Sequence, residues 1–159
     1  MRLYIASSWK NESRVLALAH LLRSVGHEVD CFCDTSTGRY VFSAVKELPN
    51  GGNLTAPEFL FQPEAQHAYD EDKKWLDWCE GVVLVLPSGK SAHLEGGYAK
   101  GKGKGLWILA PEGGWIGGEW DVMYGLADYL CETKVHLLGA LRLYQLSRND
   151  RGQRTHADP

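Results

Sequence analysis

Val82-Val83-Leu84-Val85-Leu86, an uninterrupted apolar run between Gly81 and Pro87, decides the fold class of this chain. Such a short run, rich in valine and bounded by two residues that interrupt regular structure, is typical of a strand buried on both faces. Strands of that kind occupy the centre of parallel sheets. The run is far too short to cross a bilayer.

Further strands are predicted on either side of this run, at 3–6, 27–33 and 106–109. An apolar face over residues 15–22, closed by Gly26, predicts a helix between the first two strands and therefore a right-handed βαβ crossover. The remaining periodic stretches predict helices over 64–79, 92–100, 119–131 and 135–146. The pattern predicts an α/β fold: an open parallel sheet flanked by helices, in a Rossmann- or flavodoxin-like three-layer sandwich.

Residues 1–146 are expected to form a single domain, and residues 147–159 a polar C-terminal tail that frays. Glycines and prolines interrupt every period between 35 and 63, which predicts a long loop with a short helix near 40–48. Long loops in compact domains usually serve function or move.

The chain has 159 residues, 44% of them hydrophobic, and a net charge of −3, which suits one globular domain. This balance gives no broad field for a nucleic acid polymer or an acidic membrane surface. The one basic cluster, Lys100, Lys102 and Lys104, lies in a glycine-rich turn typical of solvated loops. The N-terminus is too short and polar for a secretory signal, so a cytoplasmic location is expected. Four scattered cysteines predict reduced structural thiols and no metal site: Cys31, Cys33, Cys79 and Cys131.

The turn that follows the central strand carries the strongest chemical signal. Ser88, Gly89 and Ser91 are small residues whose backbone N–H groups can converge on an anion such as a phosphate, at the start of a helix. The turn is not a P-loop, since that spacing is absent. Glu95 is expected one turn into the helix and facing a pocket, and the alternative is a capping box with the start of the helix. His93 is either a ligand contact or a surface residue.

Two other features are candidates for the same site. Ser7 and Ser8 follow the first strand and would lie beside the Ser88 turn if the two strands are neighbours, although they also suit a helix cap. The triplet Asp70-Glu71-Asp72 is either a solvated helix start or the source of an acid that protonates a leaving group.

Three stretches of the chain resemble the nucleoside 2-deoxyribosyltransferase family and its nucleotide N-glycosidase relatives. They are residues 3–8, 72–80 and, most specifically, 87–99, within a resemblance that runs from Leu3 to about Cys131 and is poor across 35–63. The resemblance implies that Glu95 is the nucleophile that attacks the anomeric carbon and that Asp72 handles the proton of the base. It further implies that Tyr4 positions Glu95 and the sugar.

The expected activity is therefore cleavage of the base–sugar bond of a nucleoside 5′-monophosphate, or transfer of its deoxyribosyl group, without a cofactor. Lys90 beside the serines favours a 5′-phosphate. The alternatives are a non-catalytic nucleotide or nucleotide-sugar sensor, and an interaction module. The predicted substrate-binding residues are Ser7, Ser8, Ser88, Gly89, Ser91 and His93.

The resemblance also implies a homodimer or a higher homo-oligomer, in which the stretch 119–124 of one subunit reaches the site of its neighbour. Trp120, Met123 and Tyr124 suit such an interface, and ordinary core packing explains them equally well.

Overall fold

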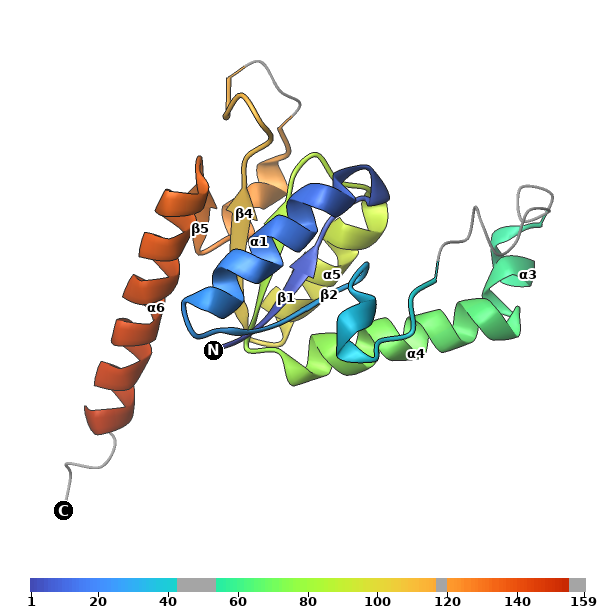
Figure 1. The fold of residues 1–159 in the computed structure, drawn as a ribbon, viewed down its shortest axis with the longest axis horizontal. Coiled ribbons are helices and arrows are strands. Elements are labelled where there is room, and N and C mark those ends of the chain that lie inside the picture. The colour runs from blue at the N-terminus through green and yellow to red at the C-terminus, as the bar shows by residue number, and fades with distance from the viewer. Residues whose placement is uncertain (43–53, 117–119, 155–159) are drawn as a thin grey trace.

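The computed structural model describes residues 1–42, 54–116 and 120–154. Its centre is a five-stranded sheet in the order β2-β1-β3-β4-β5 (Figure 1). Every neighbouring pair is parallel, which confirms the predicted fold class. The strands are β1 (Arg2–Ala6), β2 (Glu28–Cys31), β3 (Gly81–Val85), β4 (Gly105–Leu109) and β5 (Tyr129–Cys131).

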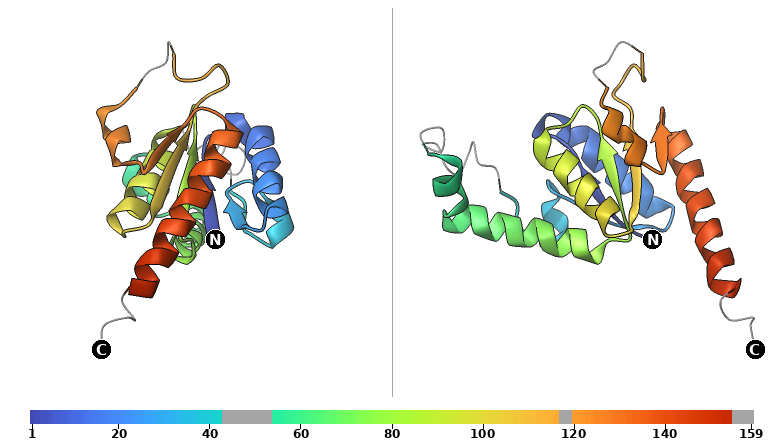
Figure 2. Two further views of the ribbon diagram at one scale, coloured as in Figure 1. Left: turned by 90° about the vertical axis from the view of Figure 1, so that its left-hand side faces the viewer. Right: turned by 180° about the vertical axis from the view of Figure 1, so that it is seen from behind.

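Helices cover both faces of this sheet and make three layers. Helices α1 and α6 pack on one face and α4 and α5 on the other, so the strands stand between α1 and α5 in Figure 2 (left). The distal part of α6 extends beyond the sheet (Figure 1). The helices are α1 (Glu12–Ser24), α3 (Ala56–Leu60), α4 (Pro63–Trp78), α5 (Lys90–Gly101) and α6 (Lys134–Arg154), with short 3-10 helices η1 (Trp9–Asn11), η2 (Thr35–Thr37) and η4 (Val122–Leu126).

The alternation of side chains along β1 decides which residues face each layer. Leu3 and Ile5 pack in the core beneath α1 and α6, whereas Tyr4 and Ala6 pack beneath α4 and α5. Tyr4 is fully buried, so its polar hydroxyl must find partners inside the protein. The same alternation in β3 and β4 builds the two halves of the core.

Helix α5 lies close to the sheet because Gly96 faces it. A Cβ atom at this position would lie 3.2 Å from Cδ1 of Leu106 on β4, which is tighter than an ordinary contact. A larger residue would require the Leu106 side chain or α5 to shift by a few tenths of an ångström. Gly96 therefore allows the close approach of α5 to β4.

The helix predicted over 119–131 is wrong. The described part of that stretch holds the short helix η4 and the edge strand β5, which pairs with β4. Between them, Asp128 accepts a hydrogen bond from the backbone N–H of Leu106 at 2.8 Å and pairs with Lys100 at 2.7 Å. These contacts tie the chain to the sheet edge, and this tertiary pairing overrides the helical spacing of the apolar residues.

The other predicted helices and strands form, with shifted ends. Helix α6 continues to Arg154, past its predicted end at Leu146 and into the predicted polar tail. Of the short helix predicted over 40–48, residues 40–42 are not helical and the rest lie outside the described residues. The predicted loop contains α3, which Thr55 and Glu58 open with a capping box.

All four cysteines are buried free thiols, and Cys31 and Cys33 bring their sulfur atoms to 4.0 Å. Among the described residues, no cluster of three or more His, Cys, Asp or Glu side chains has the arrangement of a metal site. Within the same ranges, no helix combines the length and apolar character needed to span a membrane.

Candidate active site

The three residues predicted as catalytic meet at one point on the α4–α5 side of the sheet. The hydroxyl of Tyr4 lies 3.4 Å from Oε1 of Glu95 on α5 and 3.4 Å from Oδ1 of Asp72 on α4. The two carboxyl oxygens are therefore separated by at most twice that distance. Residues from three separate elements thus form one cluster.

Glu95 does not cap its helix. Helix α5 begins at Lys90 after an N-cap at Gly89 that makes no side-chain cap bond, so Glu95 lies beyond the first turn. The capping-box alternative is therefore wrong. The carboxyl instead turns inward to the buried Tyr4 hydroxyl, and a role of Glu95 in a substrate pocket stays a prediction.

Arg39, which sequence reasoning missed, completes the cluster. Its guanidinium is only 2% exposed, and it forms ion pairs with Asp30 of β2 through Nη1 and with Asp72 through Nη2. It also lies over the Tyr4 ring, 5.6 Å from the centroid. One cation thus serves two carboxylates, while Glu95 has no cation of its own among the described residues.

Burial and neighbouring charges shift the pKa values of these carboxyl groups to different extents. Burial, followed by the negative charge of Asp72, raises the pKa of Glu95 to about 8. Burial also raises the pKa of Asp72, but Arg39 opposes that effect. Burial raises the pKa of Asp30 to about 6 and that of Tyr4 well above its ordinary value. Of the two carboxyl groups that contact Tyr4, Glu95 is therefore the one that most readily carries a proton near neutral pH.

This raised pKa predicts a pH-dependent effect of Glu95→Gln on stability. The folded protein binds the Glu95 proton more tightly than the unfolded chain, whose glutamate has its ordinary pKa of 4.5. The resulting stabilisation is complete below pH 4.5 and is lost as the pH rises to about 8. The neutral glutamine has no such loss, so the variant should gain melting temperature over wild type across this window and hold that gain above it. Thermal denaturation at a series of pH values measures the difference, and a difference that does not change with pH contradicts the assignment.

The turns after β1 and β3 lie side by side, as predicted. Ser7 donates a hydrogen bond to the carbonyl of Val85 at 2.7 Å, and Asn11 donates to the carbonyl of Pro87 at 2.7 Å. Ser8 accepts from the backbone N–H of Lys10 and caps η1. Both predicted serines therefore have structural contacts, and a role in substrate binding stays a prediction.

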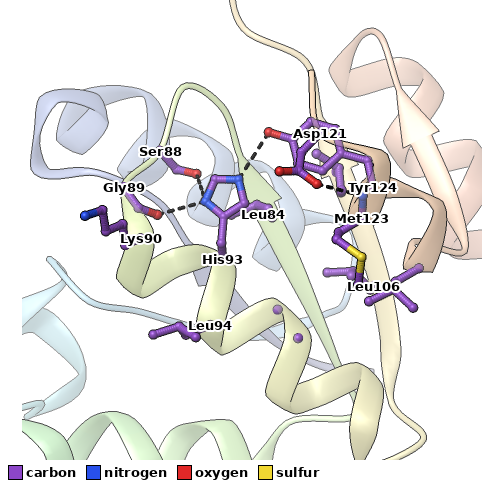
Figure 3. Close-up of a pocket in the computed structure, with 14 residues that line it drawn as sticks. Leu84, Ser88, Gly89, Lys90, His93, Leu94, Leu106, Asp121, Met123 and Tyr124 are labelled. Carbon is purple, nitrogen blue, oxygen red and sulfur yellow. Dashed lines mark hydrogen bonds between the residues drawn. The ribbon is translucent and has the colours of Figure 1, made fainter. Parts of the chain in front are cut away.

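His93 links the Ser88 turn to η4 (Figure 3). Its Nδ1 lies 2.9 Å from the carbonyl oxygen of Gly89, and its Nε2 lies 3.1 Å from the hydroxyl of Tyr124. A carbonyl can only accept, so Nδ1 carries the hydrogen and the Tyr124 hydroxyl donates to Nε2 when the ring is neutral. Ser88 Oγ is 3.4 Å from the same Nδ1, which leaves its own hydrogen available to a ligand. Ser91 is exposed.

A cavity of about 660 Å³ opens between α5 and η4, beside this turn (Figure 3). Its polar residues come from the start of α5 and from η4, and apolar side chains of β3 and β4 form its inner wall. Glu95 is not part of the lining, since its carboxyl turns toward Tyr4. The residues that line the cavity include Leu84, Ser88, Gly89, Lys90, His93, Leu106, Ile108, Asp121 and Tyr124.

The lysines of the α5–β4 turn contact other groups of the protein. Lys100 pairs with Asp128 at 2.7 Å, and Lys104 donates to the backbone carbonyls of Leu76 and Asp77. All three ammonium groups thus have partners within the protein, since Lys102 lies over the Tyr98 ring, 5.6 Å from its centroid.

Two solved structures share the fold of this chain. The 2-deoxyribosyltransferase of the psychrotolerant bacterium Bacillus psychrosaccharolyticus is 16% identical, with a TM-score of 0.57 over 86% of this chain and 90% of that chain. The CMP N-glycosidase BcmB of Clostridium botulinum is 19% identical, with a TM-score of 0.53 over 91% of this chain and 100% of that chain.

Both neighbours are enzymes. The similarity confirms the predicted fold. By sequence, no family model and no curated protein matches this chain. Any activity of this chain therefore depends on the residues of its own site.

Proposed function

We propose that this protein is an N-glycosidase that cleaves the base–sugar bond of a nucleoside 5′-monophosphate, or transfers the deoxyribosyl group, through Glu95. The observation that supports this most is the meeting of Glu95 and Asp72 at the buried Tyr4 hydroxyl. Two carboxyl groups on separate helices, held around one hydroxyl, provide the pair of acids that glycosidic cleavage uses.

The chemistry assigns the two carboxyl groups different tasks. Rupture of a C1′–N bond develops positive charge on the sugar, which the Glu95 carboxylate stabilises by attack at C1′. The departing base needs a proton, and Asp72 is placed to handle it. Water then completes hydrolysis, whereas a second base completes transfer. The two structural neighbours, named for transfer of a 2-deoxyribosyl group and for N-glycosidic cleavage of CMP, support this reaction class.

The start of α5 supports recognition of a phosphate at the 5′ position. Ser88, Gly89 and Ser91 place small side chains and backbone N–H groups at the positive end of the helix, and Lys90 adds a cation. We include His93, Ser7 and Ser8 in this binding region, since they line or brace the same pair of turns.

Ser88→Ala should weaken the binding of nucleoside monophosphates by about 1–3 kcal/mol, the usual contribution of a hydrogen bond to a charged group. Free nucleosides, which lack the phosphate, should bind almost unchanged. Isothermal titration with a matched pair of nucleoside and monophosphate measures both. An equal loss for the two ligands rules out Ser88 as a phosphate contact.

We also propose that the chain assembles as a homodimer or a higher homo-oligomer through η4. Met123 is 60% and Val122 92% exposed, which disfavours ordinary core packing as their role. Trp120 is half-exposed, whereas Tyr124 packs on Trp115 and His93. Sedimentation analysis of wild type and Met123→Asp tests this assembly, because a charge within the contact should dissociate it.

Incubation with nucleosides and their monophosphates, followed by chromatography, tests the activity. Release of free base supports the glycosidase. Stabilisation by nucleotides without release of base supports the alternative of a non-catalytic sensor.

A further inference from the structure

The hydrogen count at Tyr4 restricts where protons can lie. A tyrosine hydroxyl has one hydrogen to donate, yet two carboxyl oxygens lie 3.4 Å from it. If both carboxyl groups were ionised, one of them would face the hydroxyl oxygen with no hydrogen between. The arrangement is satisfied when one carboxyl is protonated and donates to Tyr4, while Tyr4 donates to the other.

Arg39 decides which carboxyl keeps the proton. Its guanidinium contacts Asp72 Oδ1 directly and therefore favours the ionised form of Asp72. Glu95 has no such partner, and burial raises its pKa to about 8. The resting order is therefore a protonated Glu95 that donates to Tyr4, and a Tyr4 that donates to Asp72.

We propose that Glu95, Tyr4 and Asp72 form a proton relay, in which the proton stored on the nucleophile passes through the Tyr4 hydroxyl to Asp72 and from there to the leaving base. This inference rests on the proposed function. Its consequence is that one proton movement activates both partners of the reaction: it ionises the nucleophile and neutralises the leaving group.

Transfer of the stored proton and cleavage of the C1′–N bond follow one sequence. The Glu95 O–H bond breaks as its hydrogen passes to the Tyr4 oxygen, and the original Tyr4 hydrogen passes to Asp72. Asp72 then gives its proton to a ring nitrogen of the base. The base takes the electron pair of the breaking C1′–N bond as it departs. The ionised Glu95 bonds to C1′. Water later replaces Glu95 at C1′, and its second hydrogen returns to the cluster, which restores the resting state.

Geometry and exposure suit this path. The side chain of Asp72 is 38% exposed, so it can reach a bound base, whereas Tyr4 is fully buried and has no direct contact with solvent. Both contacts of Tyr4 are longer than an ordinary hydroxyl hydrogen bond, as is common in sites without substrate, and transfer requires them to shorten.

The ionisable groups that face Glu95 come from each element packed against it. They are Tyr4 of β1, Asp72 of α4 and Arg39 of the segment after η2, and Asp30 of β2 acts through Arg39. Glu71, also on α4, pairs with Lys74 and accepts from Trp75, so it has partners outside the relay.

The relay predicts an unusual pH dependence. Wild-type kcat/KM should fall as the pH rises through about 8, because the stored proton is then lost from Glu95. A nucleophile that must ionise into solvent before attack gives the opposite slope. A rising alkaline limb therefore excludes the relay, whereas a falling limb is also expected if Asp72 carries its own proton, and Tyr4→Phe distinguishes these two cases.

Tyr4→Phe keeps the buried ring and removes the relay oxygen. At neutral pH its kcat should fall by about 10²- to 10⁴-fold, the range of general acid–base contributions. Its remaining activity should rise with pH, because Glu95 must then lose its proton to solvent. Tyr98→Phe is the matched control, since this hydroxyl also contacts a carboxylate, that of Asp77, away from the site. The control should keep the wild-type profile.

Infrared difference spectroscopy of the wild-type protein provides a readout that needs no variant. A protonated carboxyl band should be present at neutral pH, disappear above pH about 8 and be absent from Glu95→Gln. A band that is absent at neutral pH overturns the relay.

The possible results separate the two proposals. Base release whose kcat/KM rises at alkaline pH overturns the relay and leaves the glycosidase in place. A Tyr4→Phe variant whose pH profile has the wild-type shape at a lower rate does the same. A wild-type protein that releases no base overturns both.

Discussion

Glu95→Ala is expected to reduce base release by about 10⁴-fold or more, the scale on which removal of a catalytic nucleophile acts in well-studied enzymes. The methyl group of alanine can neither attack C1′ nor stabilise positive charge on the sugar. The rate of base formation under saturating substrate measures the loss.

Two controls make this result specific to Glu95. The variant should melt cooperatively and bind nucleotides, since the Glu95 side chain makes a single hydrogen bond among the described residues, to the Tyr4 hydroxyl. Asp70→Ala removes an exposed acid two positions from Asp72 on α4 and should retain full activity. Retained turnover in Glu95→Ala contradicts the proposed nucleophile.

Arg39→Met is expected to lower the free energy of unfolding by about 3–5 kcal/mol, the usual effect of removing one partner of a buried ion pair. Asp30 is 1% and Arg39 2% exposed, so the substitution leaves a buried carboxylate without its cation. Urea denaturation followed by circular dichroism gives the difference.

Arg2→Met is the matched control for this stability effect. Arg2 pairs with Glu80 at 3.9 Å, but both side chains are substantially exposed. Exposed pairs contribute about 1 kcal/mol or less. If both variants lose the same small amount of stability, the buried cluster around Arg39 is not a stabilising ion pair.

The sheet could be predicted from sequence largely because its central strands are buried on both faces. The continuous apolar run that ends at Leu86 favours a buried strand, because it is short, rich in valine and bounded by Gly81 and Pro87. β5 was missed because a three-residue strand shows no period, and its position depends on the contact between Asp128 and the backbone of Leu106. Contacts of that kind join residues far apart in the chain and leave no local pattern.

The residues of the candidate site, too, could be predicted from sequence only in part. Tyr4, Asp72 and Glu95 could be named from motif resemblance, and the structure brings them together. Arg39 lies in a segment without periodicity, so nothing local marked it. The signal that was available is Asp30, an acid within a strand predicted to be buried, because a buried carboxylate requires a cation. His93 was considered for ligand contact, and its ring nitrogens lie within hydrogen-bond distance of Ser88, Gly89 and Tyr124.

The strand order places β1 between β2 and β3, so the chain leaves β1 toward one side of the sheet and returns on the other side. A crevice at such a topological switch point exists because of connectivity, whatever side chains line it. Changes in the surrounding loops can then reshape its walls without moving it. This explains how chains with as little as 16–19% identity keep the same architecture while their loops differ.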